Sequence, residues 1–206
     1  FPDVRTLDMG GGFKVARVAG EKSTDLQKVG KPVAKLVADF AKRTGRKLHF
    51  EIEPGTFLLA NCACVLATVS DICDTGKGGY KFIKLDTGMT DILRPSLYGA
   101  QHPIEIVSAK GAKASEQYIV AGHCCESGDI LTPAPADPEA LAPRKLPNAK
   151  IGDLCAIGGA GAYCSSMSAS NYNSYPASPE VMVSRGGKIK LIRRRQTEEQ
   201  ITENEL

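Results

Sequence analysis

The chain has 206 residues, of which 42% are hydrophobic and 24% are charged, and its formal net charge is +3. Aromatic residues make up only 6% and tryptophan is absent, which disfavours a platform on which nucleic-acid bases stack. No apolar run reaches the length that a membrane helix needs. We therefore expect a globular protein with neither nucleic acid nor a membrane as a partner.

Seven cysteines occur at irregular spacings, without a Cys-x-x-Cys pair and without closely spaced histidines. This usage favours reduced thiols in the cytoplasm, or in a reducing organelle such as a plastid, over a disulfide framework. It also predicts no metal site. Cys62 and Cys64 lie two residues apart in a predicted strand, so we expect both side chains in the core.

The chain begins at Phe1, without methionine, and leads directly into a predicted strand, which suggests a start inside a domain. Residues 4–13 read as a short buried strand that ends in a glycine turn. Apolar residues at helical spacing over 26–43 predict an amphipathic helix, with Pro32 near its start. Residues 47–55 read as the next strand, which completes a βαβ unit with parallel strands.

From residue 57 to 192 the pattern changes to short β-type runs separated by Gly, Pro and Asn turns. We expect strands within 57–72, 80–86, 104–109, 118–122, 153–159, 180–184 and 188–195. This pattern predicts an antiparallel barrel or sandwich, with the proline-rich residues 132–153 as a surface loop. Thr197 and Gln200 have the spacing of a capping box, which predicts a short terminal helix.

Two glycine-containing turns follow the first two predicted strands: GGG at residues 10–12 and EPGT at residues 53–56. Because the carboxyl ends of parallel strands meet at one edge, the backbone amides of both turns could together bind a phosphate. A tight turn is the simpler explanation of the first stretch taken alone. Neither a P-loop nor a dinucleotide fingerprint is present.

Three further stretches carry reactive or charged side chains. Residues 122–129, GHCCESGD, place two thiols beside two carboxylates, as in a loop that presents side chains. Arg94 could bind a carboxylate together with Tyr98, although a surface arginine beside a buried tyrosine has the same spacing. Tyr163, between glycine-rich and serine-rich stretches, could reach a phosphate or could pack between domains.

Six stretches, in this order, resemble the diaminopimelate decarboxylases: LDMGGGF, EPGTFLLA, LDTGMTDILRPSLYGAQH, CESGD, GAYCSSMSASNYN and LIRRRQTEEQI. These enzymes are fold-type III, alanine-racemase-like decarboxylases that depend on pyridoxal 5'-phosphate. The resemblance covers nearly the whole chain. It implies that residues 1–56 are the C-terminal end of a cofactor-binding (β/α)8 barrel, an α/β fold, and that residues 57–206 are an all-β C-terminal domain.

The resemblance also implies a role for each matching residue. Those that would bind pyridoxal 5'-phosphate are Gly10, Gly11, Gly12, Glu53, Gly55 and Tyr163. Arg94 and Tyr98 would bind carboxylate groups of the substrate. Cys125 and Glu126 would enter the active site of a partner subunit, where the thiol protonates the substrate carbanion and the acid recognises the distal amino group.

The implied reaction is decarboxylation of meso-2,6-diaminopimelate to L-lysine and CO2, the last step of lysine biosynthesis, by a homodimer with shared active sites. The cofactor-carrying lysine of the family is missing, and a whole barrel needs about 250 residues. We therefore expect this chain to be a C-terminal portion, inactive alone, that works with the missing N-terminal half of the barrel. That half would belong to the same precursor or to a separate chain.

One departure leaves alternatives open. The family usually has an arginine at the position of Thr56, and a hydroxyl cannot replace a bidentate cation. A related enzyme of the same class, acting on carboxynorspermidine, ornithine, arginine or a carrier-bound amino acid, is therefore a second interpretation. A non-catalytic interaction or regulatory module is a third, against which the retained Arg94, Cys125 and Tyr163 argue.

Overall fold

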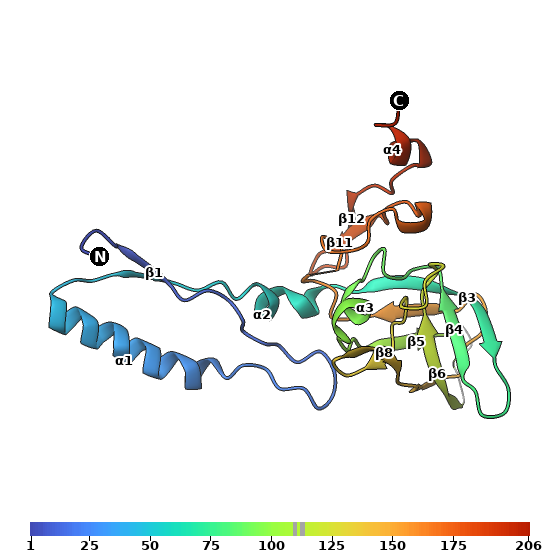
Figure 1. Cartoon of the computed structure of the whole chain (residues 1–206), viewed down its shortest axis with the longest axis horizontal. Coiled ribbons are helices and arrows are strands. Elements are labelled where there is room, and N and C mark those ends of the chain that lie inside the picture. The colour runs from blue at the N-terminus through green and yellow to red at the C-terminus, as the bar shows by residue number, and fades with distance from the viewer. Residues whose placement is uncertain (109–110, 112–113) are drawn as a thin grey trace.

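The computed structural model of the chain describes residues 1–108, 111 and 114–206, and it has an elongated N-terminal part and a sheet-rich body (Figure 1). In the N-terminal part, β1 (Thr6–Asp8) and β2 (His49–Glu51) are parallel, and α1 (Leu26–Thr44) connects them. The predicted βαβ unit is therefore confirmed. The last residue of the strand predicted over 104–109 lies outside the described residues.

Helix α1 forms between two well-defined caps. The Asp25 carboxylate accepts hydrogen bonds from the backbone amides of Gln27 and Lys28, and Gly45 ends the helix in the left-handed conformation at φ 70°. Pro32 is wrongly placed by the sequence prediction. It lies at the seventh helical position, beyond the first turn, where its missing N–H leaves the Lys28 carbonyl without its intrahelical partner.

The first of the predicted β-type runs does not begin as a strand. Residues Gly55–Leu59 form helix α2 and Ala60–Cys62 a 3-10 turn, and β3 starts only at Val65. The helix-forming leucines and alanine precede the β-branched residues, which explains this order. Cys62 and Cys64 are consequently exposed, so their predicted place in the core is wrong.

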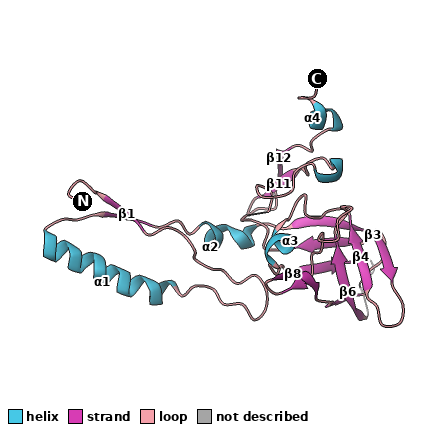
Figure 2. Ribbon diagram, in the orientation of Figure 1, coloured by secondary structure: helices cyan, strands magenta, loops and turns pink. Residues whose placement is uncertain are grey.

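The body is built on one six-stranded sheet with the order β5-β10-β3-β4-β6-β9. Its strands are β3 (Val65–Asp74), β4 (Lys81–Leu85), β5 (Ile104–Val107), β6 (Ser115–Ala121), β9 (Arg144–Pro147) and β10 (Leu154–Ile157). Strands β4 and β6 are parallel, so the sheet is mixed and the prediction of a purely antiparallel one is wrong in this respect. The edge strands β5 and β9 contact each other, which gives a nearly closed, barrel-like sheet (Figure 2).

The proline-rich residues 132–153 are more ordered than the predicted loop. They contain β7 (Pro133–Ala134), β8 (Asp137–Leu141) and β9, and β9 extends the main sheet beside β6. Proline is tolerated here because these are short or edge strands, where an absent N–H breaks no interior ladder.

A separate hairpin and a short helix follow the body in sequence. Among the described residues, strands β11 (Glu180–Val183) and β12 (Ile189–Arg193) pair only with each other, and they lead to α4 (Glu198–Thr202). The Thr197–Gln200 capping box is present, with both reciprocal hydrogen bonds, so the predicted terminal helix is confirmed.

The hydrophobic core lies inside the curved sheet. Its fully buried members include five strand residues, Val69, Ile83, Leu85, Val120 and Ile157, and Leu131 from the segment before β7. Burying each such side chain contributes about 1.5–3 kcal/mol relative to leaving it exposed.

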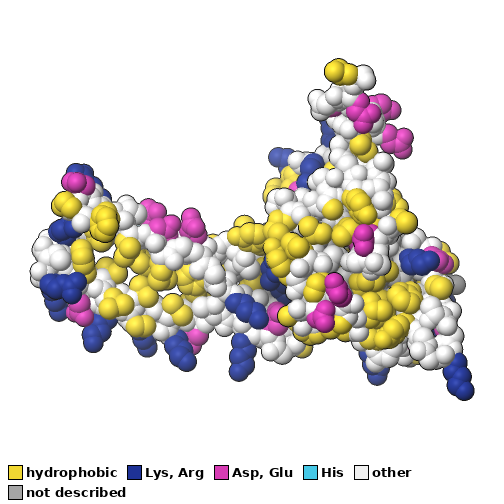
Figure 3. All heavy atoms as spheres, viewed as in Figure 1, with side chains coloured by type: hydrophobic (Ala, Val, Ile, Leu, Met, Phe, Trp, Pro, Cys, Tyr) yellow, Lys and Arg dark blue, Asp and Glu magenta, His cyan; other side chains and the backbone are white. Residues whose placement is uncertain are grey.

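The N-terminal part, in contrast, has an uncovered apolar face. Helix α1 has no buried residue, and the groove of about 570 Å³ between it and the strands is lined almost entirely by hydrophobic side chains such as Val33, Val37 and Phe50. In Figure 3, hydrophobic side chains, coloured yellow, are visible along the elongated part of the molecule. Exposed apolar surface of this extent is typical of a face that packs against further apolar residues.

A buried hydroxyl of the core gives a test of the fold. Thr132 is fully buried, and its Oγ1 accepts a hydrogen bond of 3.0 Å from the Val120 amide. The nearly isosteric Thr132→Val removes this acceptor, so we expect a loss of about 1–3 kcal/mol of unfolding free energy in denaturant titrations despite the added apolar surface. The exposed control Thr6→Val should change it by less than about 0.5 kcal/mol. Equal stability of Thr132→Val and the wild type would contradict this account.

Candidate functional site

The two glycine turns lie side by side at the ends of β1 and β2. The Glu53 amide donates to the Gly10 carbonyl at 2.9 Å, which extends the pairing of the strands into the turns. Gly10 and Gly12 have positive φ angles of 75° and 83°. A Cβ atom at Gly11 would lie 2.7 Å from the Glu53 carbonyl oxygen, so this close approach requires glycine.

The amides of these turns are not equally available. The Gly10 amide donates to Asp8 Oδ1 at 2.8 Å, and the Gly55 amide donates to the Glu53 carbonyl at 2.9 Å. Among the described residues the Gly11 and Gly12 amides have no acceptor. Two adjacent free N–H groups without side chains fit a phosphate oxygen, and the structure thus offers Gly11 and Gly12 rather than the whole stretch.

Tyr163 lies against the second turn. Its hydroxyl would be 4.0 Å from a Cβ atom added to Gly55, although the two residues are far apart in the sequence. Tyr163 has a φ of 108°, a conformation that is costly for a residue with a side chain, and half of its surface is exposed. The structure therefore brings Gly11, Gly12, Gly55 and Tyr163 together at one rim.

Arg94 and Tyr98 are the first and last residues of the one-turn helix α3 (Arg94–Tyr98). The Arg94 Cζ atom lies 5.8 Å from the centre of the Tyr98 ring, which is a cation–π distance. The Tyr98 side chain is half exposed, and the Arg94 Nε atom is buried without a hydrogen-bond partner in the described chain. A guanidinium with free donors beside a phenol can bind a carboxylate.

The thiol-containing loop, residues 122–129, is anchored by its last residue. The Asp129 carboxylate is buried and accepts hydrogen bonds from the amides of Met89 at 2.8 Å and Cys124 at 3.0 Å. Burial raises the pKa of Asp129. A Cβ atom at Gly88 or Gly122 would lie 2.2 Å from Asp129 Oδ2. Both positions therefore require glycine, because a side chain would prevent the backbone from approaching this carboxylate.

The two thiols of the loop have different environments. Burial, followed by the charge of Asp129, raises the pKa of Cys124 to about 12, so this half-buried thiol stays neutral. Cys125 is exposed. The second thiol of the pair is therefore the more accessible to an incoming molecule.

A short segment, residues 171–175, holds the loop from the other side, and we call it the brace. Asn173 Oδ1 accepts from the Cys125 amide at 2.9 Å, and the Tyr172 hydroxyl donates to Glu126 Oε2 at 3.4 Å. Three brace residues, Asn171, Asn173 and Ser174, have positive φ angles between 52° and 61°. Such a run costs conformational energy, which the surrounding contacts must offset.

His123 and Tyr175 join the loop to the brace. Their rings stack at 3.6 Å with an interplanar angle of 8°, and the Tyr175 hydroxyl donates to the His123 carbonyl at 3.0 Å. The His123 Nε2 atom lies 2.8 Å from Thr90 Oγ1, so the loop also contacts the turn before α3. Burial lowers the pKa of His123 and favours a neutral ring.

Glu126 is exposed and ionised. Its Oε1 accepts from the Gly128 amide at 3.0 Å, and this hydrogen bond is the main cause of its lowered pKa. The loop and brace line a cavity of about 900 Å³, to which Cys125 and Glu126 contribute. In the described chain no hydrogen bond or ion pair joins these two residues to the glycine rim or to Arg94.

The sequence analysis did not assign roles to Asp129, His123 or the brace. The brace does carry a usable signal, because asparagine tolerates the left-handed conformation better than most residues and two asparagines flank Tyr172. Within the described residues no group of three or more His, Cys, Asp or Glu side chains is arranged to hold a metal ion. Nor do they include a helix with the length and apolarity to cross a membrane.

Comparison with known proteins gives a family match over most of the chain. The family model described as "Pyridoxal-dependent decarboxylase, C-terminal sheet domain" matches residues 16–161. Diaminopimelate decarboxylase of Escherichia coli is 35% identical over 208 residues, covering 99% of this chain and 48% of that protein. The same enzyme of Streptomyces coelicolor is 35% identical over 207 residues, covering 99% and 46%. The chain thus spans about half the length of the curated relatives it matches.

Solved structures agree with this likeness. A crystal structure of diaminopimelate decarboxylase superposes with a TM-score of 0.90 at 36% identity, covering 99% of this chain and 48% of that one. The Helicobacter pylori diaminopimelate decarboxylase complexed with L-lysine gives a TM-score of 0.80 at 30% identity, covering 98% and 44%.

The brace gives a test by backbone amide exchange. Asn173→Gly keeps the left-handed conformation but removes the acceptor for the Cys125 amide, so we expect this amide to exchange faster by about one order of magnitude, the worth of one hydrogen bond. Asn173→Asp keeps an oxygen at the same place and should retain the protection. An equally protected Cys125 amide in Asn173→Gly would show that the brace does not hold the loop.

His102 gives a test by pH. It is fully buried, its Nδ1 donates to the Gly158 carbonyl at 2.9 Å, and burial lowers its pKa from 6.5 to about 4. Between these values the unfolded chain binds a proton that the folded chain does not. Stability present above pH 6.5 is therefore lost as the pH falls to about 4, by about 3 kcal/mol. Denaturant titrations at several pH values should show this loss in the wild type and not in His102→Asn, and parallel curves would contradict it.

Proposed function

The chain belongs to the pyridoxal-dependent decarboxylase family, whose C-terminal sheet domain it contains, and on this premise we propose that it is the C-terminal portion of a diaminopimelate decarboxylase. The reaction is the loss of CO2 from meso-2,6-diaminopimelate, which gives L-lysine. The single observation that carries the proposal is the braced loop on which an exposed thiol, Cys125, and an ionised carboxylate, Glu126, stand next to each other.

The cofactor of the family, pyridoxal 5'-phosphate, fits the residues present. In the proposal its phosphate is held by the free amides of Gly11 and Gly12, with Gly10, Glu53 and Gly55 shaping the two turns and Tyr163 at their edge. When bound, the cofactor takes up the electron pair that is released as CO2 leaves. The protein's own residues supply binding, orientation and the proton.

Arg94 and Tyr98 bind a carboxylate of the substrate, since both side chains have free donors and lie together on α3. Glu126 binds the distal ammonium group. Cys125 donates its thiol proton to the Cα atom from which CO2 has left, so one proton is gained for each CO2 lost. A thiol beside carboxylates suits a proton donor better than a nucleophile, because neighbouring negative charge disfavours the thiolate.

Cys125 and Glu126 act, in this proposal, in the site of a second copy of the chain. The two residues lie on an exposed loop, and in the described chain no hydrogen bond or ion pair joins them to the glycine rim or to Arg94 of α3. A two-fold dimer with shared sites places each loop in the partner's site.

We further propose that residues 1–56 are the end of a (β/α)8 barrel and residues 57–206 a barrel-like or sandwich domain. The uncovered groove beside α1 is apolar, as expected of a surface that packs against further barrel residues. Those residues, including the lysine that carries the cofactor, would come from the same precursor or from a separate chain. The seven free cysteines agree with a reducing compartment, the cytoplasm or an organelle such as a plastid.

The proton donor is tested by substitution in the complete enzyme. Cys125→Ala should lower kcat for meso-diaminopimelate by about 10²–10⁴-fold, because general acid catalysis contributes this much. The exposed Cys64→Ala, outside the loop, serves as the matched control and should keep the wild-type kcat. Unchanged turnover in Cys125→Ala would refute the assignment, and turnover only with another amino acid would refute the substrate.

A further inference from the structure

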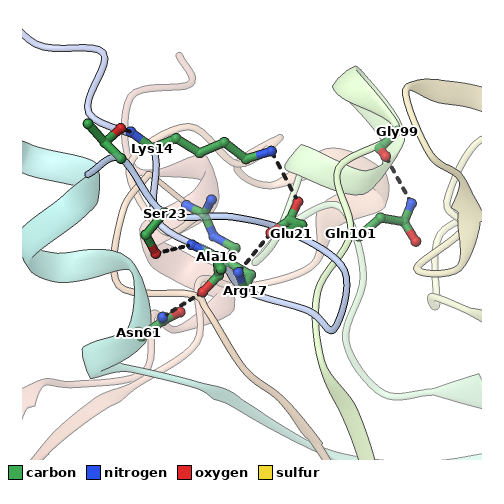
Figure 4. Close-up of polar contacts among 9 residues, drawn as sticks. Lys14, Ala16, Arg17, Glu21, Ser23, Asn61, Gly99 and Gln101 are labelled. Carbon is green, nitrogen blue, oxygen red and sulfur yellow. Dashed lines mark hydrogen bonds and ion pairs between the residues drawn. The ribbon is translucent and has the colours of Figure 1, made fainter. Parts of the chain in front are cut away.

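Arg17 lies on a loop whose course is fixed by several hydrogen bonds. In this loop, residues 14–24, the Ala16 amide donates to Ser23 Oγ at 2.9 Å and the Arg17 amide donates to Glu21 Oε2 at 2.7 Å. Asn61 Nδ2 donates to the Ala16 carbonyl at 3.0 Å and ties the loop to the body (Figure 4). The backbone at Arg17 is therefore held in place before the side chain makes any contact.

The Arg17 side chain packs against the backbone at Gly159, which has no side chain. Its Nε atom donates to the Gly159 carbonyl at 3.2 Å, 142 positions away in the sequence. A Cβ atom at Gly159 would lie 2.9 Å from Arg17 Cδ, and Gly159 has a φ of +69°. Both the close contact and the left-handed conformation therefore require glycine at this position. The Arg17 Nη2 atom, at the tip of the side chain, is buried and has no hydrogen-bond partner in the described chain.

Arg17 shares its surroundings with Arg94. The charge of Arg94 lowers the pKa of Arg17, second only to burial, and both arginines lower the pKa of the Cys164 thiol, against the larger effect of its burial. Arg94 also has a buried nitrogen, Nε, without a partner. No ion pair among the described residues includes either arginine. Two half-buried like charges with unused donors are costly unless an anion joins them.

The neighbouring groups do not supply that anion. Glu21, the carboxylate nearest in sequence, uses Oε2 for the Arg17 amide and pairs through Oε1 with Lys14 at 3.8 Å. Arg144 has protein acceptors of its own, the His102 carbonyl and Gln101 Oε1. His102 donates its Nδ1 proton to the Gly158 carbonyl, which leaves only a lone pair on Nε2. In the described chain, the buried guanidinium donors without an acceptor are therefore Arg17 Nη2 and Arg94 Nε.

We propose that Arg17 and Arg94 together form a carboxylate-binding site, in which Arg17 is a second substrate-binding cation. A planar guanidinium matches a carboxylate in geometry and charge, and two of them can satisfy both oxygens. The identity of the ligand, one carboxylate of a diamino dicarboxylic acid, rests on the proposed function. The evidence for the site itself is the unpaired donors of the two arginines and the packing of Arg17 against Gly159.

The test uses the complete enzyme and two measurements. The first is the dissociation constant of pimelate, a seven-carbon dicarboxylate without amino groups, by calorimetry; the second is KM and kcat for meso-diaminopimelate. Arg17→Met should weaken pimelate binding about 10- to 100-fold, as expected for loss of a charge-assisted hydrogen bond, and should raise KM similarly while kcat changes little. Arg17→Lys keeps the positive charge and the aliphatic part of the side chain but loses the planar guanidinium. Its dissociation constant for pimelate and its KM should lie between those of Arg17→Met and the wild type.

Lys14→Met provides the matched control, because Lys14 is an exposed cation of the same loop. It should leave both measurements within about twofold of the wild type. Normal pimelate binding and KM in Arg17→Met, with the variant folded by circular dichroism, would overturn the inference and leave the proposed function intact. Arg17-dependent pimelate binding without turnover of diaminopimelate would instead support the site and refute the proposed function.

Discussion

The buried Asp129 carboxylate organises the candidate site. It accepts amide hydrogens from two separate segments, at Met89 and at Cys124, and it lies against two glycines that leave no room for side chains. A carboxylate removed from water must be satisfied by donors, so both segments converge on it. The exposed Cys125 and Glu126 are displayed from this anchored base, and the brace then limits how far they can move.

The charges of the molecule separate into two regions. Asp129, Asp91 and Glu126 lie around the Cys124 thiol, and their charges raise its pKa, although burial has the larger effect. Arg17, Arg94 and Arg144 surround His102, and they lower its pKa after burial itself. The acidic region suits an ammonium group and a neutral thiol, whereas the basic region suits carboxylates. A substrate with both kinds of group is complementary to this arrangement.

Local sequence pattern was a good guide to elements whose contacts are local. The βαβ unit, α1 and the Thr197–Gln200 cap were predictable because helical spacing, glycine turns and capping chemistry act within a few residues. The parallel pairing of β4 with β6 and the existence of strand β9 were not predictable from local pattern. Strand partners and edge positions depend on contacts between residues that are far apart in the sequence. The proline-rich composition of residues 132–153 led to the prediction of a loop, although short and edge strands tolerate proline. In the candidate site, motifs were enough to propose Arg94 and Cys125. Asp129, the brace and Arg17 could not be proposed in this way, because their partners come near them only in the folded chain.

The order of strands in the sheet also has a consequence for the newly made chain. Strand β3 pairs with β4 a few residues later, but its other neighbour, β10, begins at Leu154, about 80 residues beyond the end of β3 at Asp74. At roughly 5–20 residues per second, a ribosome needs on the order of 4–16 s to synthesise that interval. During this time one edge of β3 has unpaired backbone groups that can join another strand. The nascent protein is thus open to misassembly after β4 and before β10 has been synthesised, while the sheet cannot yet close.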